Sequence, residues 1–391
     1  MRHSLPSNLR LFEDSGGVHA QGSPRRALWL VAVLLTWLGC SSSSSDESGG
    51  RVLLYVANTG STTVSVIDHG TRAVVETIDL GGLPHGQIPS HAGDRLYVTT
   101  EDTGEVIAID TSTQTVLWRV RGTERDTDEL HQPSITLDDR IVFAPDLLTF
   151  RLVMIDTSTG MVDGAIEVID QTNPSDPMPL VALHNSYLSG DGRFVYVEGI
   201  LSQRVAKVDI EAREVVRTYV VPGDPRPIAI LSDQSRMYVQ LTDLEGFVEI
   251  DLDTGNEVNR IEWSNTASET WQATDARLKP KSHGVGLTPD ETELWATSTM
   301  ADRWYVYSVP ELEQLAVIDI QLGNAPNWIA FTPDGAYAYV TNTTWAPGPD
   351  GEPSTDVNGT VTVIDTATRQ VVDTIEVGPL PKRIHMVEVP D

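Results

Sequence analysis

The chain has 391 residues and a formal net charge of −29, because 56 acidic residues outnumber 27 basic ones. A surface this acidic repels a nucleic-acid backbone, so we expect no nucleic-acid partner. The single cysteine excludes intrachain disulfides, thiolate metal sites and CxxCH haem attachment.

Residues 1–39 have the pattern of an export signal. Arg25 and Arg26 precede an apolar run, residues 27–38, which is too short to span a bilayer and is followed closely by Cys40. The segment LLTWLGC resembles a bacterial lipoprotein signal, in which the cysteine is lipidated after cleavage. The resemblance implies a lipid anchor on Cys40 and export to the bacterial cell envelope, on its periplasmic or surface side. An uncleaved signal anchor is the alternative.

The residues after the cysteine form a tether. They read SSSSSDESGG, a composition that cannot build a core and is typical of a flexible linker. We therefore divide the chain into a signal peptide (1–39), a lipidated cysteine with its tether (40–50) and one folded domain (51–391).

A sequence repeat organises that domain. The segment LLYVANTGSTTVSVIDHGTRAVVETIDLG at residues 53–81 returns from Arg95 as RLYVTTEDTGEVIAIDTSTQTVLWRV. It returns again near the C-terminus as GTVTVIDTATRQVVDTIEVG. Weaker copies begin at Ile141, Phe194, Met237 and Leu294.

Aspartates near the middle of the copies mark their spacing. These are Asp68, Asp110, Asp156, Asp209, Asp251 and Asp365. Successive spacings are 42 to 53 residues, apart from a gap of 114 before the last aspartate. That gap fits two copies, with Val309 in the aspartate's place in the degenerate one, so the domain contains seven units.

Each unit alternates β-branched or aromatic residues with polar ones at a period of two, and turn residues interrupt this pattern. Three such strands, with a fourth after each proline-containing connection, form a sheet of propeller-blade length. We therefore predict an all-β fold, a seven-bladed β-propeller of four-stranded blades. The first unit lacks an inner strand and the C-terminal strand lacks a partner, so residues 381–389 should close the first blade.

Four short motifs indicate a family. They are LYVT at residues 96–99, YVTN at 339–342, VIDT at 363–366 and TPDG at 332–335. With these motifs the chain resembles the YVTN-type β-propeller family over nearly everything after the tether. The resemblance implies the propeller fold but leaves function open, because such propellers resemble surface-layer proteins, lactonases and haem-binding domains alike.

One position in each inner strand carries a candidate ligand-binding residue. Counting back seven residues from the turn that ends each inner strand selects His85, His131, His184, Arg226, His283, Asn327 and Lys382. Four of the seven histidines that follow the signal fall on these positions. Because inner strands surround the channel of a propeller, we predict that the seven side chains form one ring at a channel mouth.

The ring allows three interpretations. Neutral imidazoles suit a divalent transition metal such as zinc, copper, nickel or iron, with His85, His131, His184 and His283 as ligands. Alternatively, the imidazoles hold a carboxylate or phosphate group together with Arg226 and Lys382. In the third interpretation, each histidine only hydrogen-bonds the adjoining loop.

Other candidate residues lie on the same predicted face. Long insertions at residues 122–130, 169–180, 263–281 and 343–358 bring the tryptophans Trp263, Trp271 and Trp345, with Trp328 next to the ring. Carboxylates follow the second strands, namely Glu101, Asp102, Asp146, Glu198 and Asp243. They are candidates for further ligands or a general base, although turn capping is the favoured interpretation.

No pattern for a serine or cysteine nucleophile, a phosphate loop or a HExxH zinc helix is present. The favoured hypothesis is a monomeric, membrane-tethered lipoprotein that binds a small ligand or a protein through its loop-rich face and is not an enzyme. One alternative is a metal-dependent enzyme of the lactonase or lyase kind that uses the histidine ring. Another is a haem or redox propeller with a ring histidine as axial ligand.

Overall fold

The structure is a computed structural model that describes residues 50–122, 129–170, 177–263, 281–320, 325–343 and 356–390. These residues belong to one compact unit, Gly49–Asp391. The predicted signal peptide, Cys40, Trp271 and Trp345 lie outside the described residues. In the described part of the chain, no helix is long and apolar enough to cross a membrane.

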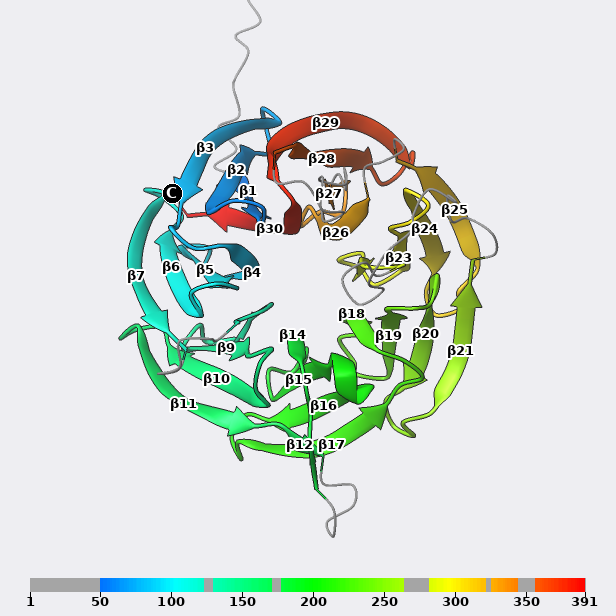
Figure 1. Ribbon diagram of the computed structural model, residues 1–391. Coiled ribbons are helices and arrows are strands. Elements are labelled where there is room, and N and C mark those ends of the chain that lie inside the picture. The colour runs from blue at the N-terminus through cyan, green and yellow to red at the C-terminus, as the bar shows by residue number, and fades with distance from the viewer. Residues whose placement is uncertain are drawn as a thin grey trace, which may run out of the picture. The chain divides into compact units, whose positions relative to one another are not determined.

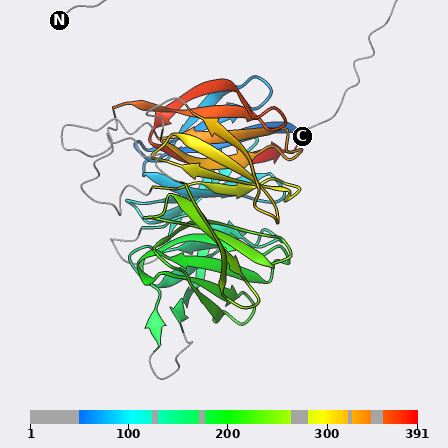
Figure 2. The same cartoon turned by 90° about the vertical axis from the view of Figure 1, so that its right-hand side faces the viewer.

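Seven four-stranded antiparallel sheets surround a central axis as the blades of a propeller (Figure 1). Viewed edge-on, the ring is one blade thick (Figure 2). This confirms the predicted seven-bladed, all-β fold. The alternating pattern fits such blades because successive side chains of a strand point to opposite faces of its sheet.

The first four blades run from the first strand to residue 220. The first contains β1 (Arg51–Asn58), β2 (Thr63–Asp68) and β3 (Ala73–Asp79), with β30 (Pro381–Val389) innermost. The second contains β4 (Pro84–Pro89), β5 (Arg95–Thr100), β6 (Glu105–Asp110) and β7 (Thr115–Arg121). The third contains β8 (Ser134–Ile135), β9 (Ile141–Pro145), β10 (Arg151–Asp156) and β11 (Met161–Glu167). The fourth contains β14 (Leu183–Leu188), β15 (Phe194–Gly199), β16 (Arg204–Asp209) and β17 (Glu214–Val220).

The last three blades follow the same order from inside to outside. The fifth contains β18 (Pro225–Ile230), β19 (Arg236–Leu241), β20 (Gly246–Asp251) and β21 (Glu257–Glu262). The sixth contains β22 (Val285–Leu287), β23 (Glu293–Ser298), β24 (Arg303–Ser308) and β25 (Gln314–Asp319). The seventh contains β26 (Pro326–Phe331), β27 (Tyr337–Asn342), β28 (Asn358–Asp365) and β29 (Gln370–Pro379). Outside the blades lie the short pair β12 (Ile169–Asp170) and β13 (Met178–Pro179) and a 3-10 turn, Ile200–Ser202.

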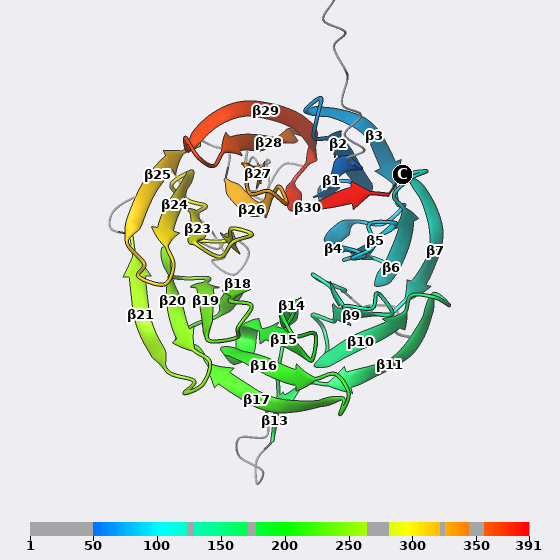
Figure 3. The ribbon, with the colours of Figure 1, turned by 180° about the vertical axis from the view of Figure 1, so that it is seen from behind.

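The C-terminal strand closes the ring, as predicted. β30 lies beside β1 and pairs with it antiparallel (Figure 3). In this pairing Leu53 lies opposite Val387. The pairing covers an edge of β1 that would otherwise present unpaired backbone groups to water.

The hydrophobic core is divided into seven clusters, each between two neighbouring blades. The cluster between the seventh and first blades joins Tyr339 and Val363 to Leu54 and Ile384, all of them buried. Burial of apolar surface between blades therefore stabilises the closed ring as a whole.

The spacing aspartates cap the turn between the third and fourth strands. In the second blade, Asp110 Oδ1 accepts bonds from the backbone N–H groups of Ser112 and Thr113 at 3.0 and 2.8 Å. In the second blade, the N–H of Gln114 donates a hydrogen bond to the backbone carbonyl of Asp110. In the sixth blade, the N–H of Leu312 donates the equivalent bond to the carbonyl of Ser308, the last residue of β24. Ser308 therefore takes the place of the aspartate, and the prediction of Val309 is wrong by one residue. The end of this strand is not evident from the sequence repeat alone.

Candidate functional site

An irregularity at the start of the inner strands aims side chains at the axis. The pairing register shifts at this point in five blades. The positions at these shifts include His85, His184, Arg226, Asn327 and Lys382. A β-bulge bends its strand and redirects a side chain, which explains why a fixed count from the turn found equivalent positions.

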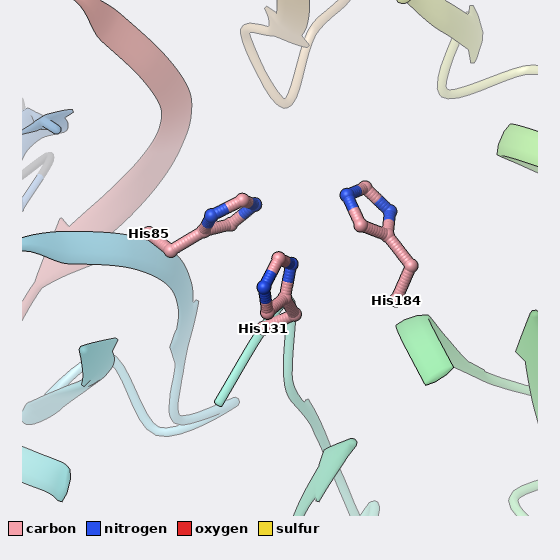
Figure 4. Close-up of side chains that lie close together, drawn as sticks. All are labelled: His85, His131 and His184. Carbon is pink, nitrogen blue, oxygen red and sulfur yellow. The ribbon is translucent and has the colours of Figure 1, made fainter. Parts of the chain in front are cut away.

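Three of the predicted histidines meet at the axis. His85, His131 and His184 come from the second, third and fourth blades, and their rings converge (Figure 4). The ring centroids of His85 and His131 are 4.0 Å apart, those of His131 and His184 4.8 Å, and those of His85 and His184 5.5 Å. One nitrogen of each ring lies within 4.8 Å of the others, and all three residues are buried. We call these residues the histidine cluster.

The other predicted residues lie around the histidine cluster. The ring of His283 is 6.0 Å from that of His184, outside the group whose nitrogens converge. Arg226 is buried and its Nε donates to Thr242 Oγ1 at 3.0 Å. Lys382 Nζ lies 3.1 Å from Glu101 Oε1.

Asn327 contacts Arg383, a residue of the site that was not predicted from the sequence. Its Oδ1 accepts a bond from Arg383 Nη1 at 3.4 Å. Arg383 is fully buried, and its Nη2 donates to Asn185 Oδ1 at 3.2 Å and to His85 Nε2 at 3.3 Å. Its guanidinium lies 4.0 Å from the ring centroid of Trp328, a cation–π contact.

Counting back seven residues selected Lys382 and missed Arg383, which follows it. In the second and sixth blades, the positions equivalent to Arg383 are the glycines Gly86 and Gly284. A Cβ on Gly86 would lie 2.4 Å from the Cα of Gln132, so that inner strand approaches the next one too closely for a side chain. Arg383 is the charged residue at this position, which holds glycine in two blades and uncharged residues in the others, and that difference was the available signal.

Carboxylates lie beside the histidine cluster. Glu101 Oε1 accepts a hydrogen bond from the Nδ1–H of His85, whose Nε2 accepts one from Arg383. Glu198 accepts a bond from Asn185 at 2.8 Å and lies 3.7 Å from His184 Nδ1, while Glu129 lies 3.9 Å from His131 Nε2. The predicted candidates Glu101 and Glu198 therefore contact ring histidines.

Asp146 has the turn-capping role that was favoured for these carboxylates, because it accepts a bond from the N–H of Leu148 at 3.0 Å. Asp102 instead accepts a bond from the N–H of Leu83, 19 positions earlier, at 2.7 Å. Trp263 is also structural: its ring stacks on Tyr305 with centroids 4.2 Å apart.

Burial sets the charge state of the histidines. Desolvation lowers the pKa of His131 and holds the pKa values of His85, His184 and His283 well below the usual range. The imidazoles are therefore neutral near pH 7, the form in which histidine ligates metals.

The pKa values of the two buried glutamates shift in opposite directions, and that of Arg383 is lowered. Burial raises the pKa of Glu198 well above its usual value. Burial alone would also raise the pKa of Glu101, but the charge of Lys382 and the hydrogen bond from His85 hold it well below its usual value. Burial lowers the pKa of Arg383 to about 10, so the guanidinium stays positive near neutral pH.

Several buried polar atoms at the site have no hydrogen-bond partner among the described residues. They are both ring nitrogens of His131, Nδ1 of His184, Nδ1 of His283 and Nε of Arg383. Buried polar groups are normally satisfied, so these atoms mark a place where a ligand can bind. Imidazole lone pairs suit borderline metals, and N–H groups with a guanidinium suit an oxyanion.

A separate cavity of about 310 Å³ opens towards the C-terminal ends of the inner strands. It is lined by Ile135, Tyr187, Leu188 and His385, among others, and Trp328 also contributes to its wall.

Comparisons with known proteins place the fold among other propellers. The family model described as PQQ_2, outer membrane protein assembly factor BamB, matches residues 25–261. The model described as lactonase, 7-bladed beta-propeller, matches residues 249–343. Two curated relatives, both described as uncharacterized protein YncE, come from Salmonella typhi and Salmonella typhimurium. Each is 26% identical over 192 residues, 48% of this chain and 50% of the relative, so the chain spans about half the length of the curated relatives it matches.

Two solved structures share the fold at low sequence identity. One is the dihydro-heme d1 dehydrogenase NirN in complex with DHE, with a TM-score of 0.58 and 16% identity over 85% of this chain and 74% of that one. The other is a candidate 6-phosphogluconolactonase from Bacteroides fragilis, with a TM-score of 0.62 and 16% identity over 88% of this chain and 99% of that one. At this identity the likeness concerns the fold alone.

Proposed function

This chain belongs to the β-propeller family described as outer membrane protein assembly factor BamB, and on that premise we propose that it is a binding module for a small anionic ligand. The ligand carries a carboxylate or phosphate group and binds at the axial end formed by the histidine cluster and Arg383.

The observation that carries this proposal is the buried charge of Arg383. Its partners are neutral: two side-chain amide oxygens, an imidazole nitrogen, a backbone carbonyl and an indole ring. Among the described residues, no carboxylate oxygen lies within 4.0 Å of its guanidinium nitrogens. A buried charge without an ionic partner is costly, and an anionic ligand would supply that partner.

The surroundings supply further positive charge for an anion beside Arg383. In a chain with a net charge of −29, Arg226, Lys382 and Arg383 gather at one end of the axis. Because Glu101 already contacts Lys382, and burial favours the neutral form of Glu198, these carboxylates do not provide a full counter-charge for Arg383. Imidazole N–H groups would add hydrogen bonds to an oxyanion.

Isothermal titration of the purified full chain with acetate, succinate, citrate and inorganic phosphate tests the proposal. We expect at least one of these anions to bind, and Arg383→Gln to weaken its binding by about 10- to 100-fold, the effect of losing a charge-assisted hydrogen bond. Arg303→Gln is the control, because Arg303 pairs with Asp319 at 2.6 Å on the exposed side of β24. Equal affinity in wild type and Arg383→Gln would contradict the proposal, and so would a failure of all four anions to bind.

A metal-dependent lactonase or lyase is the second candidate. The match of residues 249–343 to the lactonase model and the three converging imidazoles favour it. Chelator-sensitive hydrolysis of a lactone by the purified chain would support this candidate, whereas a Soret band would instead support a haem or redox propeller.

We also propose that the module works outside the cytoplasm. The lipoprotein-like signal would tether the propeller to a bacterial membrane through Cys40, where the ligand or a protein partner meets the loop-rich face.

A further inference from the structure

We infer that His85, His131 and His184 bind one divalent transition-metal ion, of the class of zinc, copper, nickel or iron. The inference deepens the proposed function. It rests on that function in one respect, because the anion would occupy the coordination position of the metal that the three histidines leave free.

The geometry of the histidine cluster is close to that of a metal site. One nitrogen from each ring lies within 4.8 Å of the other two. Zinc–nitrogen bonds of about 2.1 Å in a tetrahedral site place the nitrogens about 3.4 Å apart. The rings need to approach one another by roughly 1.4 Å, on the same geometric argument, a change that side-chain rotation can supply.

Each of the three imidazoles has a carboxylate behind it. Glu101 pairs with His85 Nδ1, Glu129 lies 3.9 Å from His131, and Glu198 lies 3.7 Å from His184. At His85 the hydrogen bond to Glu101 fixes the tautomer and makes the other nitrogen a better ligand, whereas the carboxylates at 3.7 and 3.9 Å lie beyond hydrogen-bond distance. The charge of Glu101 also offsets part of the charge that a divalent cation would add beside Lys382 and Arg383.

The chemistry of the donors limits the choice of metal. An all-imidazole set suits zinc, copper, nickel and iron, whereas calcium and magnesium prefer oxygen ligands. Both ring nitrogens of His131 are buried and have no hydrogen-bond partner among the described residues, so one lone pair is available for a metal.

Metal and anion would be linked through His85. Its Nε2 now accepts a bond from Arg383 Nη2 at 3.3 Å. A metal on that lone pair would release the Arg383 N–H, which could then bind an anion occupying the fourth coordination position. Three protein ligands with an exchangeable fourth position are typical of catalytic and ligand-binding zinc sites.

The test is a Co²⁺ titration of the chelator-treated full chain, followed by visible absorption. We expect a single equivalent to produce the intense ligand-field bands of a low-coordinate Co²⁺ site, and acetate to shift them. His131→Ala and His184→Ala should each weaken Co²⁺ binding by about 100-fold or more, and Glu101→Gln by about 10- to 100-fold.

His91→Ala is the matched control. His91 also pairs with a carboxylate through Nδ1, 2.7 Å from Asp139, but it lies outside the histidine cluster. Its replacement should leave the Co²⁺ affinity unchanged. Thermal melts of the metal-free variants verify folding, and Glu101→Gln keeps all three imidazoles if an alanine variant does not fold.

The outcomes separate the inference from the proposed function. Anion binding by the chelator-treated protein, with no Co²⁺ bands, overturns the metal site and leaves the anion site standing. Co²⁺ binding that depends on His131 and His184, together with no anion binding by calorimetry, supports the metal site and contradicts the anion proposal. Co²⁺ binding that is equal in wild type and His131→Ala overturns the inference.

Discussion

Arg383 donates a hydrogen bond to Asn185 across the axis, at 3.2 Å and over 198 positions of sequence. Arg383 lies on β30, the strand that closes the first blade, and Asn185 lies on β14 of the fourth blade. Closure of the ring and assembly of the candidate site therefore depend on the same strand.

Arg383→Met should leave the thermal stability of the ligand-free protein unchanged or slightly higher. The substitution removes the desolvation cost of a fully buried guanidinium, while methionine retains apolar contact with Trp328. Asn185 and Asn327 each lose a donor, which limits the gain. Differential scanning calorimetry without added anions measures the effect.

Leu54→Ala provides the comparison for Arg383→Met. Leu54 is fully buried between the first and seventh blades, so its truncation should cost about 2–5 kcal/mol. If Arg383→Met destabilises the protein as much as Leu54→Ala does, the buried charge is structural and the argument for a missing anion fails.

The sequence was sufficient to predict the propeller because its signals are local and repeated. The period of two, the capping aspartates and the unpaired end strands specify blade number and closure without tertiary information. The histidine positions followed from the same register, so His85, His131 and His184 could be predicted to meet.

The sequence alone could not show which of two adjacent residues on the bulged strand β30 is buried at the axis. Both Lys382 and Arg383 lie near the axis, but only the backbone shift at Ala57 and Asn58 shows which one is buried across it. The roles of the carboxylates were equally hidden. Glu101 contacts His85 whereas its neighbour Asp102 accepts a bond from the backbone N–H of Leu83, and this difference depends on side-chain direction at a strand end.

Ile384→Ala should destabilise the propeller through its closing strand. Ile384 is fully buried in the cluster between the seventh and first blades, so the expected cost is about 2–5 kcal/mol. Glu388→Ala, at an exposed position of the same strand, should change the stability by less than about 0.5 kcal/mol. Urea unfolding followed by tryptophan fluorescence measures both, and equal midpoints would argue against closure by β30.

The capping aspartates should make stability fall in acid. Hydrogen bonds hold the pKa values of all six below the usual value of 3.8, and at Asp110 the Ser112 hydroxyl contributes most. Because the folded-state pKa is depressed, this stabilisation is complete above the unfolded-state pKa and is lost as pH falls through the folded-state value.

Replacing Asp110, Asp156, Asp251 and Asp365 by asparagine tests this pH dependence. The amide oxygen still accepts the turn hydrogen bonds but does not titrate in acid, so the drop in Tm between pH 6 and pH 3 should become smaller. Glu388→Gln, outside the turns, is the control. An unchanged acid shift in the quadruple variant would mean that other groups govern acid unfolding.

Cys40→Ser should release the protein from the membrane. If Cys40 carries an acyl anchor, metabolic labelling with palmitate will mark the wild-type chain, and the substitution will abolish the label and move the protein to the soluble envelope fraction. Since Cys40 is the single cysteine of the chain, no other thiol can carry the label. Ser41→Ala, one position further along, should retain both label and membrane fraction. An unlabelled wild-type chain in the membrane fraction would instead favour the uncleaved signal anchor, in which residues 27–38 and their flanks hold the protein in the bilayer.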